Sequence, residues 1–184
     1  RETENMGDTI TFYHAPQTRG AVVHWLLEEI GQPYAYHLLN LSQGQQKDPA
    51  YLAVNPMGKV PAIAHRDVVV TEVAAICCYL ADAFPGAGLA PPIGDLRRGP
   101  YLKWLFFGPG CLEPALIDRM SAREPVPARM AGYGDFATTF DVVAKAVTGG
   151  SHLLGEQFTA ADIVIGSGLR WGMMVGAIPE RPEF

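Results

Sequence analysis

Residues 58–83, GKVPAIAHRDVVVTEVAAICCYLADA, decide the fold. Two short apolar runs, Val60–His65 and Val68–Thr71, are separated by Arg66-Asp67, which predicts a tight antiparallel hairpin. The next segment, Glu72–Ala83, has apolar side chains at helical spacing, and the Phe-Pro-Gly tripeptide after it ends a helix. This stretch is therefore predicted to form two strands and a helix.

A strand, a helix and a second strand are predicted before the hairpin. Thr9–Tyr13 is rich in β-branched and aromatic residues, which favours a strand. Thr18–Ile30 carries apolar side chains every three or four residues, and Gly31 and Pro33 end this helix. Tyr34–Leu39 follows as a strand that a helical crossover places parallel to the first. The first half is thus an α/β domain.

The composition changes after residue 84, where we expect a domain boundary. Residues 85–94 carry three prolines and three glycines, and no alternating strand pattern occurs beyond them. Helices are predicted over 95–120, 127–148 and 160–176, with Gly108-Pro109-Gly110 kinking or breaking the first. We expect four parts: residues 1–8, an N-terminal extension or expression remnant; 9–84, the α/β domain; 85–94, a linker; and 95–184, an all-α domain that is incomplete at its C-terminus.

Composition and charge disfavour several classes of protein. The chain has 184 residues, and 48% of them are apolar, which is ample for a hydrophobic core. Its 14 Lys and Arg against 19 Asp and Glu give a net charge of −5, without a basic block that would suggest nucleic acid. No apolar run reaches the roughly 18 residues of a membrane span. Nucleic acid and membranes are therefore not expected partners.

The cysteines and histidines do not suggest a disulfide framework or a metal site. Three cysteines are an odd number, and no CxxC motif occurs. His14, His24 and His37 lack a regular spacing for a metal. A reducing cytoplasm fits this cysteine usage best.

Two further motifs concern local structure. Pro61 lies at the start of a predicted strand, and a cis Val60-Pro61 bond would turn the amide and carbonyl of Val60 outward, able to bind a peptide backbone. A plain trans proline that starts a strand is the alternative. Thr159 and Asp162 predict a capping box at a helix start, which is a folding role.

In combination these motifs resemble those of bacterial cytosolic glutathione transferases. The resemblance rests on NPMGKVPAI at 55–63, TEVAAICCYLAD at 71–82 and FTAADIVIG at 158–166. It implies a thioredoxin-like N-terminal domain that binds glutathione and an all-α C-terminal domain that binds a small apolar electrophile. It further implies a cytoplasmic detoxification enzyme that is usually a homodimer, with glutathione as co-substrate and no cofactor. Hydroperoxide reduction is a second possible activity.

The resemblance also implies where glutathione would bind. Glu72 and the backbone after it would hold the γ-glutamyl group, although an acid is favoured at a helix start in any case. Val73 stands where Ser or Thr is common in the family, so one hydroxyl is missing. Val60 and Pro61 would bind the peptide backbone, and Lys59 would bind the glycine carboxylate or remain a solvated loop residue.

Thr18 and Arg19 are the candidates for activating the thiol. A cysteine-type thiol ionises near pH 8.5, and lowering that pKa by two units needs about 2.7 kcal/mol. A helix N-terminus and one hydroxyl donor together supply this amount. Thr18 is closest in chemistry to the family's hydroxyl, and its alternative role is a helix cap. No cysteine occurs in Tyr13–Gly20, which speaks against the family's thiol-dependent members.

The electrophile pocket is predicted least sharply. The resemblance suggests His14, Phe107 and Cys111 as lining residues, although aromatic side chains at helical spacing are more often core. Because Val73 departs from the family pattern, an alternative is a non-catalytic binding or interaction module that keeps the fold.

Overall fold

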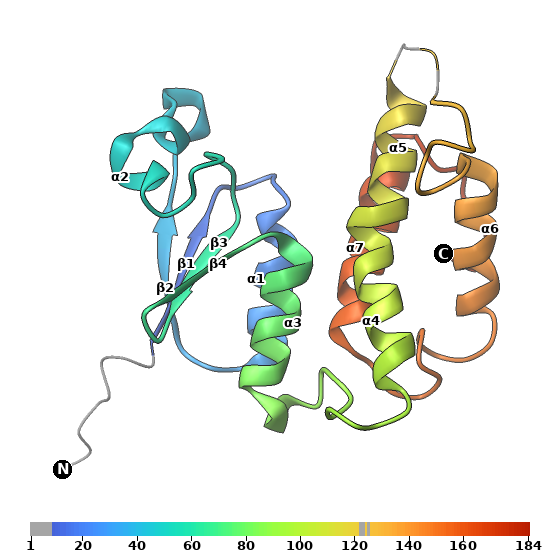
Figure 1. Ribbon diagram of the computed structural model, residues 1–184, viewed down its shortest axis with the longest axis horizontal. Helices are drawn as coiled ribbons and strands as arrows, with labels where there is room; N and C mark the ends of the chain where they lie inside the picture. Colours follow the sequence, from blue (N-terminus) through green and yellow to red (C-terminus); the bar gives the residue numbers. More distant parts are fainter. Residues whose placement is uncertain (1–8, 122–123, 125) are drawn as a thin grey trace. The chain divides into compact units, whose positions relative to one another are not determined.

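The computed structural model describes residues 9–121, 124 and 126–184. The chain divides between residues 87 and 88 into two compact units, which we describe in turn (Figure 1). The expected N-terminal extension, residues 1–8, lies outside the described residues.

Unit 1 is built on a four-stranded mixed sheet with the order β2-β1-β3-β4. β1 pairs with β2 in parallel, and the β3–β4 hairpin joins β1 in antiparallel orientation. The predicted Arg66-Asp67 turn closes this hairpin, with φ of 51° and 61° at the two residues. The elements are β1 (Ile10–His14), α1 (Gly20–Ile30), β2 (Tyr34–Leu38), η1 (Leu41–Gln43), η2 (Gln45–Lys47), α2 (Pro49–Leu52), β3 (Ala62–His65), β4 (Val68–Thr71), α3 (Val73–Ala83) and η3 (Pro85–Ala87).

Alternation along β1 assigns its side chains to the two faces of the sheet. Phe12 is fully buried, and its ring contacts His24 of α1. The neighbouring Tyr13 points to the other face, where its ring contacts Tyr51 of α2. α1 and α3 lie side by side on the Phe12 face. The prediction of a thioredoxin-like α/β domain is confirmed.

Four elements of unit 1 begin later than the sequence predicts, and β1 does so by one residue, at Ile10. β3 begins at Ala62, because Pro61 has no N–H for the ladder. α1 begins at Gly20 rather than at Thr18, whose hydroxyl donates back to the Ala15 carbonyl at 2.6 Å. α3 begins at Val73, so the prediction that Glu72 lies in its first turn is wrong.

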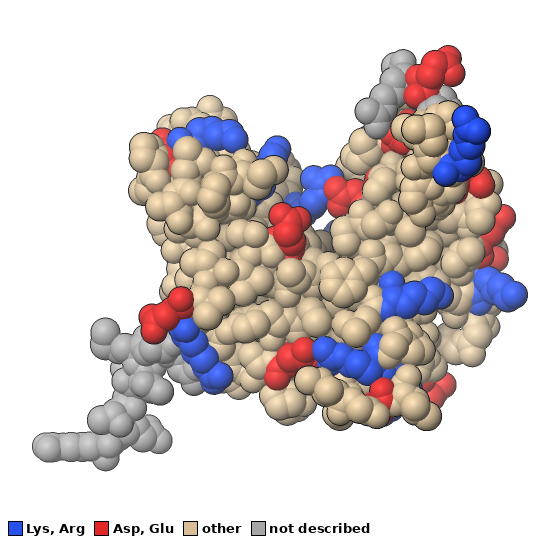
Figure 2. Space-filling view, in the orientation of Figure 1, with Lys and Arg blue, Asp and Glu red and all other residues tan. Residues whose placement is uncertain are grey.

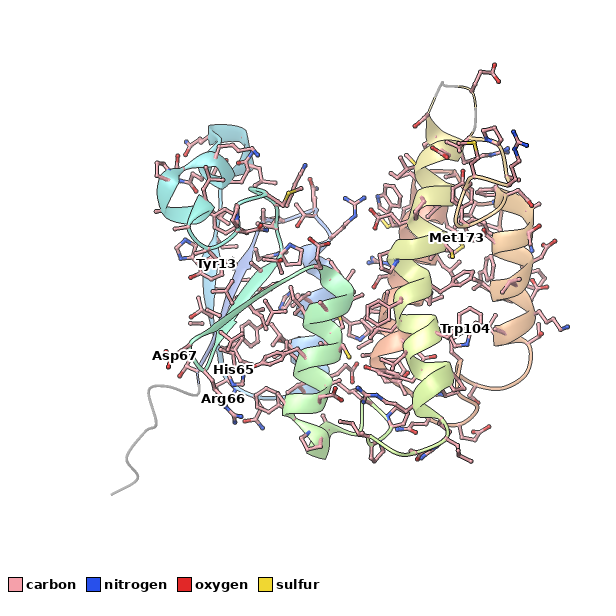
Figure 3. The ribbon with its side chains drawn as sticks, in the orientation of Figure 1. Tyr13, His65, Arg66, Asp67, Trp104 and Met173 are labelled. Atoms are coloured by element: carbon pink, nitrogen blue, oxygen red, sulfur yellow. The ribbon has the colours of Figure 1, made fainter. Side chains whose placement is uncertain are left out.

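Unit 2 is helical, as predicted, with a core formed where α4 packs on α7. Buried side chains on these helices include Trp104 and Leu105 of α4 and Ile163 of α7. The elements are α4 (Arg98–Phe107), η4 (Gly108–Leu112, a π-helical turn), α5 (Glu113–Met120), α6 (Phe136–Val147) and α7 (Ala160–Met174). Figure 3 labels Trp104 on α4 and Met173 on α7.

Two helix predictions in unit 2 need correction. The expected helix over 95–120 begins at Arg98, and the Gly108-Pro109-Gly110 tripeptide forms a π-helical turn that continues directly into α5. The helix expected from residue 127 begins only at 136, because Asp135 caps it by accepting the Thr138 N–H at 2.9 Å.

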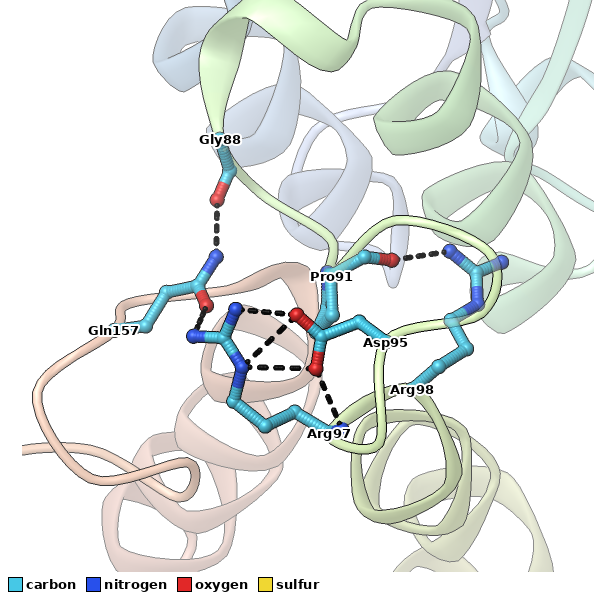
Figure 4. Close-up of polar contacts among 6 residues, drawn as sticks. All are labelled: Gly88, Pro91, Asp95, Arg97, Arg98 and Gln157. Carbon is cyan, nitrogen blue, oxygen red and sulfur yellow. Dashed lines mark hydrogen bonds and ion pairs between the residues drawn. The ribbon is translucent and has the colours of Figure 1, made fainter.

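Side-chain bonds hold the first segment of unit 2, residues 88–98, to the loop before α7 (Figure 4). Gln157 accepts from Arg97 at 2.9 Å and donates to the Gly88 carbonyl at 3.0 Å. Arg97 also forms an ion pair with Asp95. The capping box predicted for Thr159 and Asp162 is confirmed at the start of α7.

Among the described residues, no helix combines the length and hydrophobicity needed to cross a membrane.

Candidate functional site

The candidate site of unit 1 lies at the edge of the sheet where β1 and β4 end and β3 begins. Ala62 of β3 pairs with Tyr13 of β1 and with Thr71 of β4. Both pairings are antiparallel, so the next residues outward are His14, Pro61 and Glu72. The register therefore brings these three predicted site residues to the same edge.

Two helices begin at this same edge. α1 follows β1 after a five-residue loop, and α3 follows β4 directly. Their unpaired N–H groups and the positive ends of their dipoles lie at this end of the sheet. Neither helix has an acidic residue in its first turn, and the nearest one is Glu72 at the N-cap position of α3. The edge is therefore suited to an anionic ligand.

The Val60-Pro61 bond is cis, as its position favoured. The loop before it is fixed by two donors to the Lys59 carbonyl, the Tyr51 hydroxyl at 2.6 Å and the Asn55 amide at 2.8 Å. In the described part of the chain, neither the N–H nor the C=O of Val60 is seen to bond to the protein. A rigid loop thus presents an unpaired backbone N–H and C=O of one residue, Val60, at the site.

Two lysines flank this loop. Lys59, the predicted cation, is exposed. Lys47 was missed, although its ammonium donates to the Met57 carbonyl at 3.2 Å. Gly58 allows this approach: its φ is +60°, and an added Cβ would lie 2.7 Å from both the Lys47 ammonium and the Gln46 carbonyl. Figure 2 shows basic side chains over the end of unit 1 that carries α2.

Thr18 lies just before α1, and its hydroxyl bonds to the backbone both as a donor and as an acceptor. Its hydroxyl donates to the Ala15 carbonyl at 2.6 Å and accepts the Gly20 N–H at 3.2 Å. Arg19 occupies the N-cap position, is exposed and makes no capping bond with its side chain. Thr18 therefore caps α1 from the residue before the N-cap, whereas the capping alternative placed it at the N-cap itself.

His14 is buried beneath the start of α1. Only 7% of its surface is exposed, and its ring stacks on Phe12 with 5.0 Å between centroids. Burial, and secondarily His24, lowers the pKa of this imidazole, so it stays neutral at neutral pH. Its depth disfavours the predicted role as a lining residue of an apolar pocket.

Glu72 has a backbone conformation that is unusual for its residue type. Its φ is 69° and its ψ is 120°, a region that side chains with a Cβ rarely adopt. Its carboxylate is exposed, and Val73 after it is half-buried. Such outliers cost about 1–3 kcal/mol and cluster at functional sites.

Phe107 and Cys111 belong to unit 2, whereas the other predicted site residues belong to unit 1. Phe107 ends α4 and contacts Trp104 edge to face, with 5.3 Å between centroids. Cys111 lies in η4, and partial burial raises the pKa of its thiol. The Cys111 thiol therefore lacks the lowered pKa that would mark a reactive cysteine.

Within the described residues, no cluster of three His, Cys, Asp or Glu side chains could hold a metal ion. Cys77 is fully buried, and burial raises the pKa of its thiol, as expected of an inert core cysteine.

Comparisons with known proteins agree with this architecture. Residues 8–82 match the family model for the glutathione S-transferase N-terminal domain. Glutathione S-transferase GstA of Escherichia coli O157:H7 is 26% identical over 89% of this chain and 82% of its own. The disulfide-bond oxidoreductase YfcG of Escherichia coli K12 is 28% identical over 84% of this chain and 76% of its own.

A solved structure supports the same assignment for both units. The glutathione S-transferase of a sphingomonad, complexed with glutathione, is 29% identical, with a TM-score of 0.73 over 90% of this chain and 84% of its own. The two-unit architecture is thus the glutathione transferase fold. Together with the motifs on the sheet edge, these matches lead to one conclusion: residues 8–82 form a glutathione S-transferase N-terminal domain, within a chain that has the glutathione transferase fold.

Proposed function

We propose that this chain binds glutathione at the sheet edge of unit 1 and activates its thiol. The observation that carries the proposal is the meeting of the α1 and α3 N-termini with the unpaired backbone N–H and C=O of Val60 at one edge. A tripeptide with two carboxylates matches a site with two positive helix ends and an unpaired backbone N–H and C=O.

Glutathione is assigned one orientation by these groups. The γ-glutamyl carboxylate meets the N-terminus of α3, and its ammonium meets the exposed carboxylate of Glu72. The cysteine backbone bonds to Val60, beside Pro61. The glycine carboxylate lies toward Lys59 and Lys47, of which Lys47 is held beside the loop by Met57.

The thiol then lies at the start of α1, near Thr18 and Arg19. Free glutathione is mostly protonated at neutral pH. A partly buried helix N-terminus contributes up to ~2 kcal/mol to holding a thiolate, and one hydroxyl donor adds about 1.5–3 kcal/mol. Thr18 must release the Ala15 carbonyl to donate this bond. Arg19 raises the positive potential from its exposed position.

The thiolate attacks a small apolar electrophile, or reduces an organic hydroperoxide. Phe107 and Cys111 remain our candidates for the electrophile pocket. We also propose a cytoplasmic homodimer that acts in detoxification, which is the arrangement that the family resemblance implies. Light scattering at micromolar protein tests the dimer, because a monomeric mass contradicts it.

A second function is a glutathione-binding module without catalysis. Two observations favour it: Val73 lacks the common hydroxyl, and the Thr18 hydroxyl is bonded within the loop. The relative YfcG is named a disulfide-bond oxidoreductase, but this chemistry is less favoured here because no cysteine lies in the loop before α1.

One experiment separates these functions. Calorimetric titration with glutathione is combined with a conjugation assay on an activated aryl halide, for the wild type, Thr18→Ala and Thr18→Ser. Binding with turnover that Thr18→Ala loses and Thr18→Ser keeps supports the enzyme. Binding without turnover supports the module. The absence of binding at millimolar glutathione overturns both.

A further inference from the structure

We propose that His14 takes up the proton that glutathione loses when its thiol binds at the start of α1. The inference rests on the proposed function, because it requires the thiol at that helix end. It concerns a residue that the sequence suggested as a pocket lining.

The first observation is the slot that Gly20 leaves open. A Cβ added to Gly20 would lie 2.1 Å from Nδ1 of His14 and 3.2 Å from Oγ1 of Thr18. The imidazole and the hydroxyl therefore face one position, which any larger residue at 20 would fill. Because Gly20 has no side chain, nothing from the first residue of α1 stands between the imidazole and the hydroxyl.

The second observation is that Nδ1 of His14 has no hydrogen-bond partner among the described residues. Nine-tenths of this side chain is buried, so water does not satisfy the nitrogen freely. Unsatisfied buried polar atoms are rare in proteins and often mark catalytic groups or absent ligands. The nitrogen is aimed at the start of α1, where an anion is favoured.

The transfer runs through Thr18 and balances as one proton moved. The S–H bond breaks and its proton passes to Thr18 Oγ1, while the hydroxyl proton of Thr18 passes to Nδ1 of His14. Thr18 ends as a hydroxyl that donates to the thiolate and accepts from the Nδ1–H of the imidazolium. Before the transfer, the Thr18 hydroxyl turns away from the Ala15 carbonyl and moves within hydrogen-bond distance of Nδ1 of His14, which it does not contact in this structure.

The surroundings of His14 favour this direction only when the thiolate is present. The groups that face its ring are His24 on α1 and Tyr36 on β2, at 6.1 and 5.9 Å between centroids. Behind them, Glu28 lies 3.7 Å from His24 and accepts from Tyr34. No carboxylate in the described residues bonds to His14 directly, so the empty site keeps a neutral base. A nearby thiolate supplies the negative charge that stabilises the imidazolium.

The test counts the protons released per thiolate formed. Glutathione is titrated calorimetrically in buffers of different ionisation enthalpy near pH 7, where the free thiol is almost fully protonated, and bound thiolate is measured by its ultraviolet absorbance. S-methylglutathione, which has no thiol proton, provides the reference for binding. His14→Gln is compared with His37→Gln, a matched change of an exposed histidine whose ring contacts Tyr13 on the other face.

Wild type and His37→Gln are expected to release almost no proton per thiolate, and His14→Gln about one. Equal release by wild type and His14→Gln overturns the inference. If His14→Gln fails to bind S-methylglutathione, Thr18→Val decides: release of about one proton supports the relay, and release equal to that of wild type overturns it. If wild type binds neither ligand, the proposed function itself fails.

Discussion

Glu72→Gly separates the backbone cost of residue 72 from its role in binding. The residue holds φ at 69°, which costs about 1–3 kcal/mol for a side chain with a Cβ. Glycine adopts this conformation without that cost but loses about 0.5–1 kcal/mol through the freedom of the unfolded chain. We expect unit 1 to gain about 1 kcal/mol in its free energy of unfolding.

The same change should weaken glutathione binding. A bond between the Glu72 carboxylate and the glutathione ammonium is worth about 1.5–3 kcal/mol, and the exposure of Glu72 favours the lower limit. The expected loss is about tenfold in the dissociation constant. Urea unfolding monitored by circular dichroism measures stability, and calorimetric titration measures affinity.

Two control variants make the result interpretable. Glu72→Gln removes the charge and keeps the backbone conformation, so affinity should fall without a gain in stability. Asp67→Gly replaces another residue with positive φ at the hairpin turn, away from the site, so affinity should not change (Figure 3). The reasoning is refuted if Glu72→Gly lowers stability, or if it binds glutathione as tightly as wild type.

Three further predictions concern single side chains. Gly58→Ala should destabilise unit 1 by about 1–3 kcal/mol and weaken glutathione binding, because its Cβ would lie 2.7 Å from a backbone carbonyl and φ is +60°. Gly86→Ala, with open space around it, is the control, and equal melting curves for the two variants would contradict this prediction. Val73→Ser should tighten glutathione binding by about 1 kcal/mol, or roughly fivefold, and Val73→Ala is the control without a hydroxyl. Calorimetric titration measures both affinities, and equal affinities of the Ser and Ala variants would count against α3 as the γ-glutamyl site. Asp162→Ala should lower the free energy of unfolding by about 1–3 kcal/mol, because the carboxylate accepts from the Thr159 and Leu153 amides at 2.8 Å. Urea unfolding measures this change, and a value within error of wild type would show that the capping box does not stabilise the fold.

Local patterns in the sequence were sufficient for most of the fold. The two-residue Arg66-Asp67 turn leaves one register for the hairpin, and that register brings Pro61 and Glu72 together. The capping box at Thr159 was also visible, because both partners lie within four residues of each other. Contacts of this kind depend on neighbours in the chain, so spacing alone predicts them.

Contacts between distant residues could not be predicted in this way. Lys47 reaches the Met57 carbonyl across ten residues, and nothing in its own surroundings signals this. Thr18 looked like a helix start, but its hydroxyl bonds to the loop and α1 begins two residues later. The orphaned nitrogen of His14 depends on the absence of a side chain at Gly20. Each of these features was decided by tertiary contacts.

The central claim is that glutathione binds at the edge of the sheet where α1 and α3 begin. Nuclear magnetic resonance of the nitrogen-labelled chain during a glutathione titration tests it residue by residue. The account predicts saturable shifts at the amides of Gly20, Val60 and Val73, with little change at Arg66 and Asp67. The absence of shifts at the first three amides, while glutathione binds, would contradict it.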